Sequence, residues 1–87
     1  PPRPYGYSRD RENGYRYQER LDRKYAKAMH RLDRQEAEAR AKAYRKSDGD
    51  PVRYREKMAK IERKYDHKRY KVERNTAQGY RKLSGRY

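Results

Sequence analysis

The stretch "SDGDP" at residues 47–51 is the clearest break in this chain of 87 residues. Gly49 suits the left-handed conformation that often ends a helix, and Asp50 can accept hydrogen bonds from the first amides of a following helix. Pro51 fits the first turn of that helix. Because a turn this short usually makes two long helices antiparallel neighbours, the stretch predicts an all-α fold, an antiparallel two-helix hairpin.

The chain on either side of this turn is rich in helix-forming residues. No glycine or proline occurs from Tyr15 to Lys46, and most residues there are Ala, Arg, Lys, Glu, Gln or Leu. We expect helices over about 15–46 and 51–78 within a hairpin that spans 15–83, with Gly79 weakening the second helix. Residues 1–14, "PPRPYGYSRDRENG", hold three of the four prolines and are expected to form an extended N-terminal arm, and 84–87 to form a short tail.

A pattern of one basic, one apolar, one acidic and one basic residue occurs twice in each expected helix. It appears as RLDR at 20–23 and 31–34, as KIER at 60–63 and as KVER at 71–74. Eleven residues take about three helical turns, so the apolar members of each pair lie on nearly the same face. Neighbouring positions widen each apolar stripe. The first stripe is Leu21, Tyr25, Ala28, Leu32, Ala39 and Ala43, and the second is Tyr54, Met58, Ile61, Tyr65, Val72 and Leu83. A shift of forty residues maps one helix onto the other, by internal duplication or by convergence on one amphipathic pattern.

Folding the chain about Gly49 sets residue x against roughly residue 98 minus x. This register places Ala39 and Ala43 near Met58 and Tyr54, and it places Tyr25 near Val72. The stripes are narrow, and the free energy gained by burying them hardly offsets the entropy lost by ordering two long helices. We therefore expect the hairpin to be completed by oligomerisation or by a polyanionic partner.

The charge balance points to the class of partner. Lys and Arg number 27 against 13 Asp and Glu, which gives a net charge of +14. Basic residues recur at intervals of three or four, so they form a column along each helix. The first basic column is Arg16, Arg20, Arg23, Lys27, Arg31 and Arg34, and the second basic column is Arg53, Lys57, Lys60, Lys64, Lys68 and Lys71. Both columns are expected to border the apolar stripes and to bind the phosphates of a nucleic acid or the charges of another polyanion.

Eleven tyrosines supply amphipathic rings in a chain that has no Phe or Trp. Tyr25, Tyr54 and Tyr65 are expected to pack between the helices. The candidates for base stacking, phosphate hydrogen bonds or arm contacts are Tyr5, Tyr7, Tyr17, Tyr44, Tyr70 and Tyr80. The alternative interpretation of the basic columns is a solvated helix surface with pairs such as Glu19–Arg23 and Glu56–Lys60.

The sequence offers little for catalysis. Cysteine is absent, and the two histidines, His30 and His67, have no third metal ligand expected nearby. The carboxylates lie among Arg and Lys, which favours their ionised form. No glycine-rich phosphate loop is present. We therefore expect no enzyme activity, no metal and no cofactor. No apolar run approaches the roughly 20 residues that cross a bilayer, so no transmembrane segment is expected.

The function expected from these features is non-enzymatic binding or packaging of nucleic acid, with contacts to the phosphate backbone and little base-sequence specificity. Neither the helix-turn-helix DNA-binding proteins nor the basic leucine zippers fit, because the helices are too long for the first and a leucine heptad is missing for the second. The alternative is a structural or interaction protein of a larger assembly, exported or in the cell envelope, that binds an acidic protein, a glycan or an anionic surface. Pro1 at the start leaves exported and intracellular locations equally open.

Overall fold

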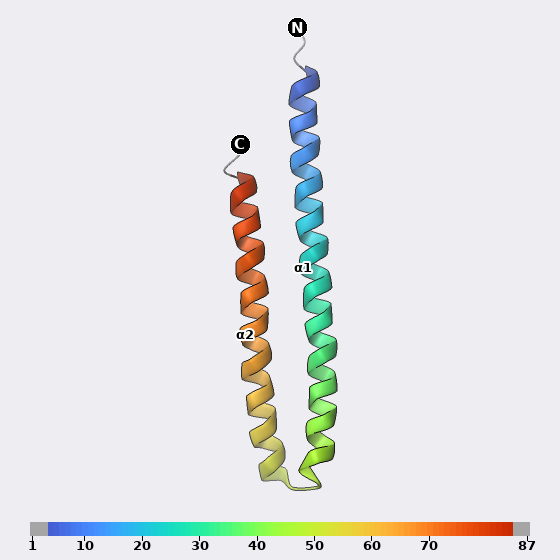
Figure 1. The fold of residues 1–87 in the computed structure, drawn as a ribbon, viewed down its shortest axis with the longest axis vertical. Coiled ribbons are helices and arrows are strands. Elements are labelled where there is room, and N and C mark those ends of the chain that lie inside the picture. Colours follow the sequence, from blue (N-terminus) through green and yellow to red (C-terminus); the bar gives the residue numbers. More distant parts are fainter. Residues whose placement is uncertain (1–3, 85–87) are drawn as a thin grey trace.

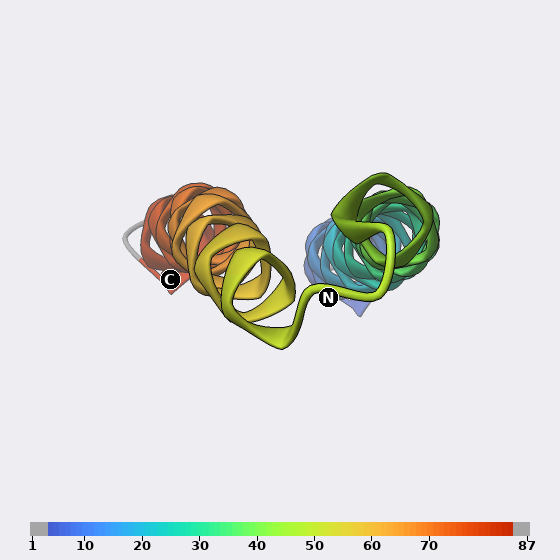
Figure 2. The same cartoon turned by 90° about the horizontal axis from the view of Figure 1, so that it is seen from below.

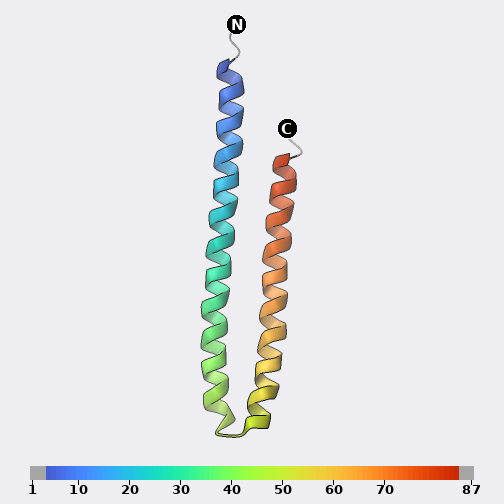
Figure 3. The same ribbon diagram turned by 180° about the vertical axis from the view of Figure 1, so that it is seen from behind.

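The protein is a hairpin of two long α-helices. The computed structural model describes the backbone of residues 4–84 and the side chains of residues 14–83. Helix α1 spans Pro4–Ser47 and helix α2 spans Pro51–Ser84, and no strand occurs in this part of the chain. The helices run antiparallel, and α1 projects beyond the end of α2 (Figures 1 and 3). The all-α antiparallel hairpin predicted from the sequence is confirmed.

The turn uses the residues that the sequence indicated. Asp48 and Gly49 have φ angles of 50° and 80°, a left-handed conformation that glycine and aspartate tolerate better than most residues. The carboxylate Oδ1 of Asp50 accepts hydrogen bonds from the backbone amides of Val52 at 2.9 Å and Arg53 at 3.3 Å. Asp50 is therefore the N-cap of α2. Figure 2 shows the short connection between the helices from below.

The contact between the helices, which we call the seam, is thin. Only three apolar residues of the described side chains are buried, namely Leu32, Ala43 and Tyr65, and each retains 6–8% of its exposure. All the other members of both predicted stripes are half-buried. The apolar stripes were therefore predicted correctly, and they cover little area for two helices of 44 and 34 residues.

The register between the helices agrees with the expected pairing at the turn and departs from it farther out. Near the turn the rings of Tyr44 and Tyr54 meet edge to face, with 5.9 Å between their centroids. Farther out, the Tyr80 hydroxyl donates a hydrogen bond to Asp22. Tyr25 lines a hollow with Glu73 and Thr76 of α2, close to the position that the expected register gives it.

The direction of helical side chains explains this departure. Each side chain leans toward the N-terminus of its own helix, so in an antiparallel pair the two sets lean in opposite directions along the axis. Asp22 leans toward the open end of the hairpin, and Tyr80 leans toward the turn. In a pair of side chains that meet, the α2 residue therefore lies farther from the turn than a level pairing predicts, and the α1 residue lies nearer to the turn.

The extended N-terminal arm predicted over residues 1–14 is wrong for residues 4–14, which form the first turns of α1. Pro4 suits the first position of a helix because its missing N–H is not needed there. Gly6 and Gly14 each cost only about 1 kcal/mol relative to alanine, which does not stop the helix. Residues 1–3 and the side chains of Tyr5 and Tyr7 lie outside the described part of the chain.

The second helix also continues farther than predicted, through Gly79 to Ser84. Gly79 is buried, and a Cβ placed on it would lie 2.8 Å from Cδ2 of Leu21. Glycine at this position therefore lets α2 approach α1 closely near the open end. The sequence pattern suggested a helix end because it did not show which neighbour would face Gly79.

Candidate nucleic-acid interface

The repeated four-residue pattern sorts charges onto two sides of the seam. Its apolar members, Leu21, Leu32, Ile61 and Val72, are buried or half-buried. Successive helical residues are rotated by about 100°, so the residue before a seam residue lies on one flank and the residue after it lies on the other. Basic residues come before the apolar member and acidic residues come after it. Each helix therefore has one basic flank and one acidic flank.

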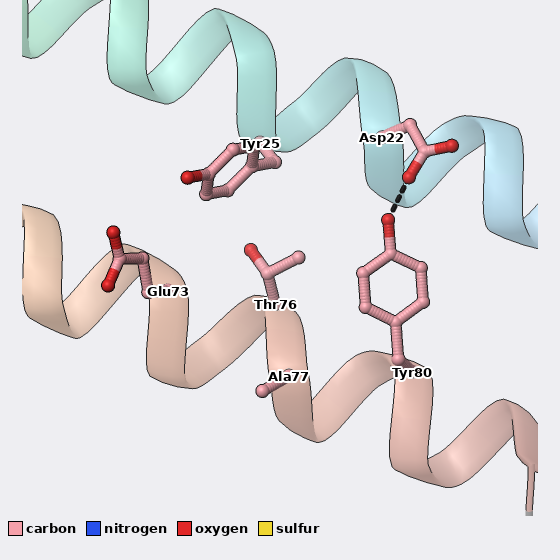
Figure 4. A pocket seen from close by; sticks show the side chains of 6 residues that line it. All are labelled: Asp22, Tyr25, Glu73, Thr76, Ala77 and Tyr80. Atoms are coloured by element: carbon pink, nitrogen blue, oxygen red, sulfur yellow. Dashed lines mark hydrogen bonds between the residues drawn. The ribbon is translucent and has the colours of Figure 1, made fainter.

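Contacts across the seam show that the two acidic flanks lie on the same side of the hairpin. Asp22 follows Leu21 in α1 and bonds to Tyr80 of α2 (Figure 4). Asp33 follows Leu32 in α1 and accepts a hydrogen bond at 2.8 Å from Arg69 of α2. In an antiparallel pair, the residues that follow a seam residue lie on the same side of the hairpin in both helices. The two acidic flanks therefore lie side by side, and so do the two basic flanks.

The acidic flanks form a surface that we call the carboxylate–tyrosine face. Its carboxylates are Glu19, Asp22, Asp33, Glu36, Glu62, Asp66 and Glu73, and its aromatic rings are Tyr15, Tyr44 and Tyr80. Helical spacings of three, four, seven, eight or eleven residues join the members within each helix. Tyr15 and Tyr44 are 67% and 72% exposed, so this face presents both aromatic and acidic groups to a partner.

An ion cluster joins the helices on this face. Arg69 bonds to Asp33 and Glu36, and Glu36 also accepts a hydrogen bond at 2.9 Å from Arg40. Glu36 is 8% exposed, and the bonds from Arg69 and then Arg40 hold the pKa of its carboxyl below the ordinary value. The same bonds to Glu36 raise the pKa of both guanidinium groups. Glu36 is therefore held as a buried carboxylate within a cationic pair.

The opposite side of the hairpin, which we call the cationic face, follows a simple rule. Eleven of the twelve residues that directly precede a stripe residue are Lys or Arg, and the exception is Glu38. They are Arg20, Lys24, Lys27, Arg31, Lys42, Arg53, Lys57, Lys60, Lys64, Lys71 and Lys82. All are exposed except Lys57, which is half-buried. The ion pairs among side chains 14–83 use Arg40 and Arg69, so no member of the cationic face is paired with a carboxylate there.

The second basic column borders the seam as expected. Five of its six members belong to the cationic face, and we count the sixth, Lys68, with that face because it lies half-buried beside them. Lys64 and Lys68 lie on either side of the buried Tyr65, with their Nζ atoms 5.9 and 5.1 Å from the ring centroid. These are cation–π contacts, and they keep the two ammonium groups beside the seam. The pairs Glu19–Arg23 and Glu56–Lys60, suggested by the alternative interpretation, are not among the ion pairs of the described side chains.

The first basic column does not border the seam as expected. Arg23 and Arg34 come two residues after Leu21 and Leu32, which places them about 200° around the helix from the seam. All six residues of the column are exposed. The column therefore covers the outer side of α1 and meets the cationic face along its edge, at Arg20, Lys27 and Arg31. The position of this column was predicted wrongly because residue spacing shows which residues share a column, but not the angle between that column and the apolar stripe.

Most of the tyrosines suggested for base stacking do not lie beside the basic columns. Tyr44 and Tyr80 belong to the carboxylate–tyrosine face, where they contact Tyr54 and Asp22. Tyr70 is 58% exposed and lies away from the seam, and Tyr17 is half-buried. Stacking by tyrosine on the cationic face is therefore not favoured by this arrangement. The signal that separates the two faces, acidic or basic character next to each apolar residue, was present in the sequence.

The described side chains do not gather into a metal centre. His30 and His67 are both exposed, and no cluster of three or more His, Asp or Glu side chains suited to a metal ion occurs among residues 14–83. Neither helix, over the part of the chain that the structure describes, contains an apolar segment long enough to cross a membrane.

Comparisons with protein-family models, with curated proteins and with solved structures find no match to this chain.

Proposed function

We propose that this chain is a non-enzymatic nucleic-acid-binding or packaging protein that contacts the phosphate backbone through its basic helix faces, with little dependence on base sequence. The observation that carries this proposal is the cationic face, eleven Lys and Arg side chains in register along the hairpin without a carboxylate partner among the described side chains. Within the runs 20–31 and 53–64 these cations follow one another at intervals of about 5.4 Å, which complements a chain of phosphates.

The charge distribution supports backbone contacts more than base contacts. Lysines dominate the cationic face of α2, and lysine binds phosphate as a point charge without the bidentate geometry that distinguishes bases. The exposed tyrosines lie mainly on the other face, which leaves few rings for base stacking. We therefore expect binding that falls steeply with salt and differs little between sequences.

We also propose that the chain self-associates. Among side chains 14–83, the buried apolar residues are Leu32, Ala43 and Tyr65, whereas Tyr15, Tyr44 and Tyr70 are each more than half exposed. A net charge of +14 opposes association, and a bound polyanion would reduce that repulsion.

The test compares two double variants with equal changes in charge. Lys60→Gln with Lys71→Gln removes the first residue of KIER and of KVER, on the cationic face, whereas Arg63→Gln with Arg74→Gln removes the last residue of the same motifs, on the outer side of α2. Labelled single-stranded and duplex oligonucleotides are titrated at several salt concentrations, and binding is followed by fluorescence anisotropy.

Wild-type affinity is expected to fall as salt rises, with a slope that reports the number of phosphates contacted. The Lys pair is expected to reduce that slope by about 0.7–0.9 for each lost contact, and the Arg pair by less than half as much. Absence of binding at low salt, or a flat response to salt, would reject nucleic-acid binding and favour the alternative of a structural protein with a different partner.

A further inference from the structure

The carboxylate–tyrosine face retains groups that suit a cationic partner. Arg69 and Arg40 hold Asp33 and Glu36, but Glu19, Asp22, Glu62 and Glu73 are in no ion pair among the described side chains. Aromatic rings accompany these carboxylates. Tyr15, which is exposed, lies four residues before Glu19, and Tyr80, which is half-buried, lies seven after Glu73. Lysine and arginine side chains bind carboxylates through their charge and aromatic rings through cation–π contacts.

A hollow on this face has the chemistry of a socket for a cationic side chain. It has a volume of about 410 Å³ and lies between α1 and α2 near the open end. Tyr25 and Tyr80 face it from opposite helices, and Asp22 and Glu73 lie at its edge (Figure 4). The aliphatic stem of a lysine or arginine can lie against the rings while its charged head reaches a carboxylate.

The same chain carries a surface that matches this one in sign and in spacing. On the carboxylate–tyrosine face, Asp22 and Asp33 are eleven residues apart, as are Glu62 and Glu73. On the cationic face, Arg20 and Arg31 are eleven residues apart, as are Lys60 and Lys71. Eleven helical residues rise about 16 Å, so charges on both faces repeat at the same interval along two nearly straight helices.

We propose that the carboxylate–tyrosine face of one hairpin docks onto the cationic face of a second copy of this chain. This inference rests on the self-association proposed above and names the surfaces that produce it. The contact is heterologous, since different faces meet, so each added copy offers a new docking face and the assembly grows as a stack. Arg16, Arg23 and Arg34 are the members of the first basic column that do not belong to the cationic face. They stay outside the contact on the outer side of α1, where they remain accessible to a polyanion.

The test uses two charge-reversed variants and sedimentation velocity over a range of protein and salt concentrations. Glu62→Lys with Glu73→Lys reverses the charge at two positions of the carboxylate–tyrosine face, whereas Lys60→Glu with Lys71→Glu reverses the charge at two positions of the cationic face. Each variant alone is expected to remain monomeric where the wild type associates. An equal mixture of the two is expected to associate again, because each reversed face now finds its complement.

A conservative pair controls for misfolding. Glu62→Gln with Glu73→Gln is expected to weaken association about tenfold, whereas Asp48→Asn with Glu56→Gln, which changes the charge equally at exposed positions outside both faces, leaves it unchanged. Helicity of every variant is measured by circular dichroism. A wild type that stays monomeric at every concentration, equal effects of the two neutralised pairs, or a mixture of reversed variants that stays monomeric would overturn the proposal.

Oligonucleotide affinity of the same variants, measured in dilute solution, separates this inference from the proposed function. If oligonucleotide binding persists while the hairpins do not associate, only the docking of one hairpin onto another is rejected. If the variants and their mixture associate as expected while oligonucleotide binding is absent, only nucleic-acid binding is rejected.

Discussion

The two faces of the hairpin are built from the same repeated pattern, yet they make different contacts. On the carboxylate–tyrosine face, Arg69 bonds to Asp33 and Glu36, and Tyr80 bonds to Asp22, so polar contacts join α1 to α2. On the cationic face, no ion pair or polar hydrogen bond crosses the seam among the described side chains. One face therefore helps to hold the hairpin together, and the other leaves its charge available.

The difference shows how a chain with so few aliphatic residues fixes the pairing of its helices. The seam is too thin to set the register by apolar packing alone, since only three apolar side chains among residues 14–83 are buried. The Arg69 cluster and the Tyr80–Asp22 bond add directional contacts that a shifted register would lose. The cationic face repels itself across the seam and adds no such contact. Stability and partner binding should thus respond separately to changes on the two faces.

Substitutions in the seam should have the largest effect, because both faces exist only while the two helices stay packed together. We expect Ile61→Ala with Tyr65→Ala to unfold the hairpin, since large-to-small changes at packed sites cost about 2–5 kcal/mol each and small domains have only about 5–15 kcal/mol of stability. Circular dichroism should show loss of most helical signal and of a cooperative melt. A double variant that melts within a few degrees of the wild type would show that the seam does not hold the helices.

Removing the central cation of the carboxylate–tyrosine face should have the next largest effect. Arg69→Met leaves the buried carboxylate of Glu36 with Arg40 alone, and a buried charge that loses a partner is destabilising. We expect a clear fall in the melting temperature. The matched change Lys68→Met, at the adjacent position on the cationic face, should leave the melting temperature nearly unchanged. Equal falls in the melting temperatures of the two variants would show that the two faces contribute equally to the stability of the hairpin.

Acid should weaken the same face. The pKa of Glu36 in the folded hairpin lies below its ordinary value of 4.5, so the stability contributed by its ionised form is present above that value. This contribution is lost as the pH falls through the lower, folded-state pKa. We expect the difference in melting temperature between wild type and Glu36→Gln to be constant from neutral pH to about pH 5 and to shrink below about pH 4.5. A constant difference down to pH 2 would contradict the described bonds to Glu36.

The smallest effect on stability should come from the cationic face. Lys64→Ala with Lys68→Ala removes two like charges and two cation–π contacts to Tyr65, and these changes oppose each other. We expect the melting temperature to stay within a few degrees of the wild type while oligonucleotide affinity falls. A large loss of stability would mean that the two lysines hold Tyr65 in the seam and are not primarily available to a partner.

The hairpin and its turn could be predicted because local chemistry specifies them. Gly49, Asp50 and Pro51 each favour one position at a helix end, and the eleven-residue repeat keeps each stripe on one side of its helix. The start of α1 was missed because two glycines and a proline weaken a helix without ending it when neighbours are good helix formers. The role of Gly79 was missed because it depends on Leu21, a residue that is distant in sequence.

The basic residues of the candidate interface were also found from the sequence, but their division between two surfaces was not. Spacing identifies which residues share a column, whereas the angle between a column and the seam decides whether the column borders the partner helix. The ion cluster of Asp33, Glu36 and Arg69 was missed because the lean of helical side chains brings together positions that a level register keeps apart.

We propose that the cationic face of this hairpin binds a polyanion and that the carboxylate–tyrosine face does not. Positions 71 and 73 test it most directly, because they lie on either side of Val72 and differ mainly in the face to which they belong. A photoreactive benzoylphenylalanine is placed at Lys71 in one variant and at Glu73 in another, and each is irradiated with a labelled oligonucleotide in dilute solution. We expect strong cross-linking from position 71 and little from position 73. Equal cross-linking from both positions, or stronger cross-linking from position 73, would contradict polyanion binding by the cationic face.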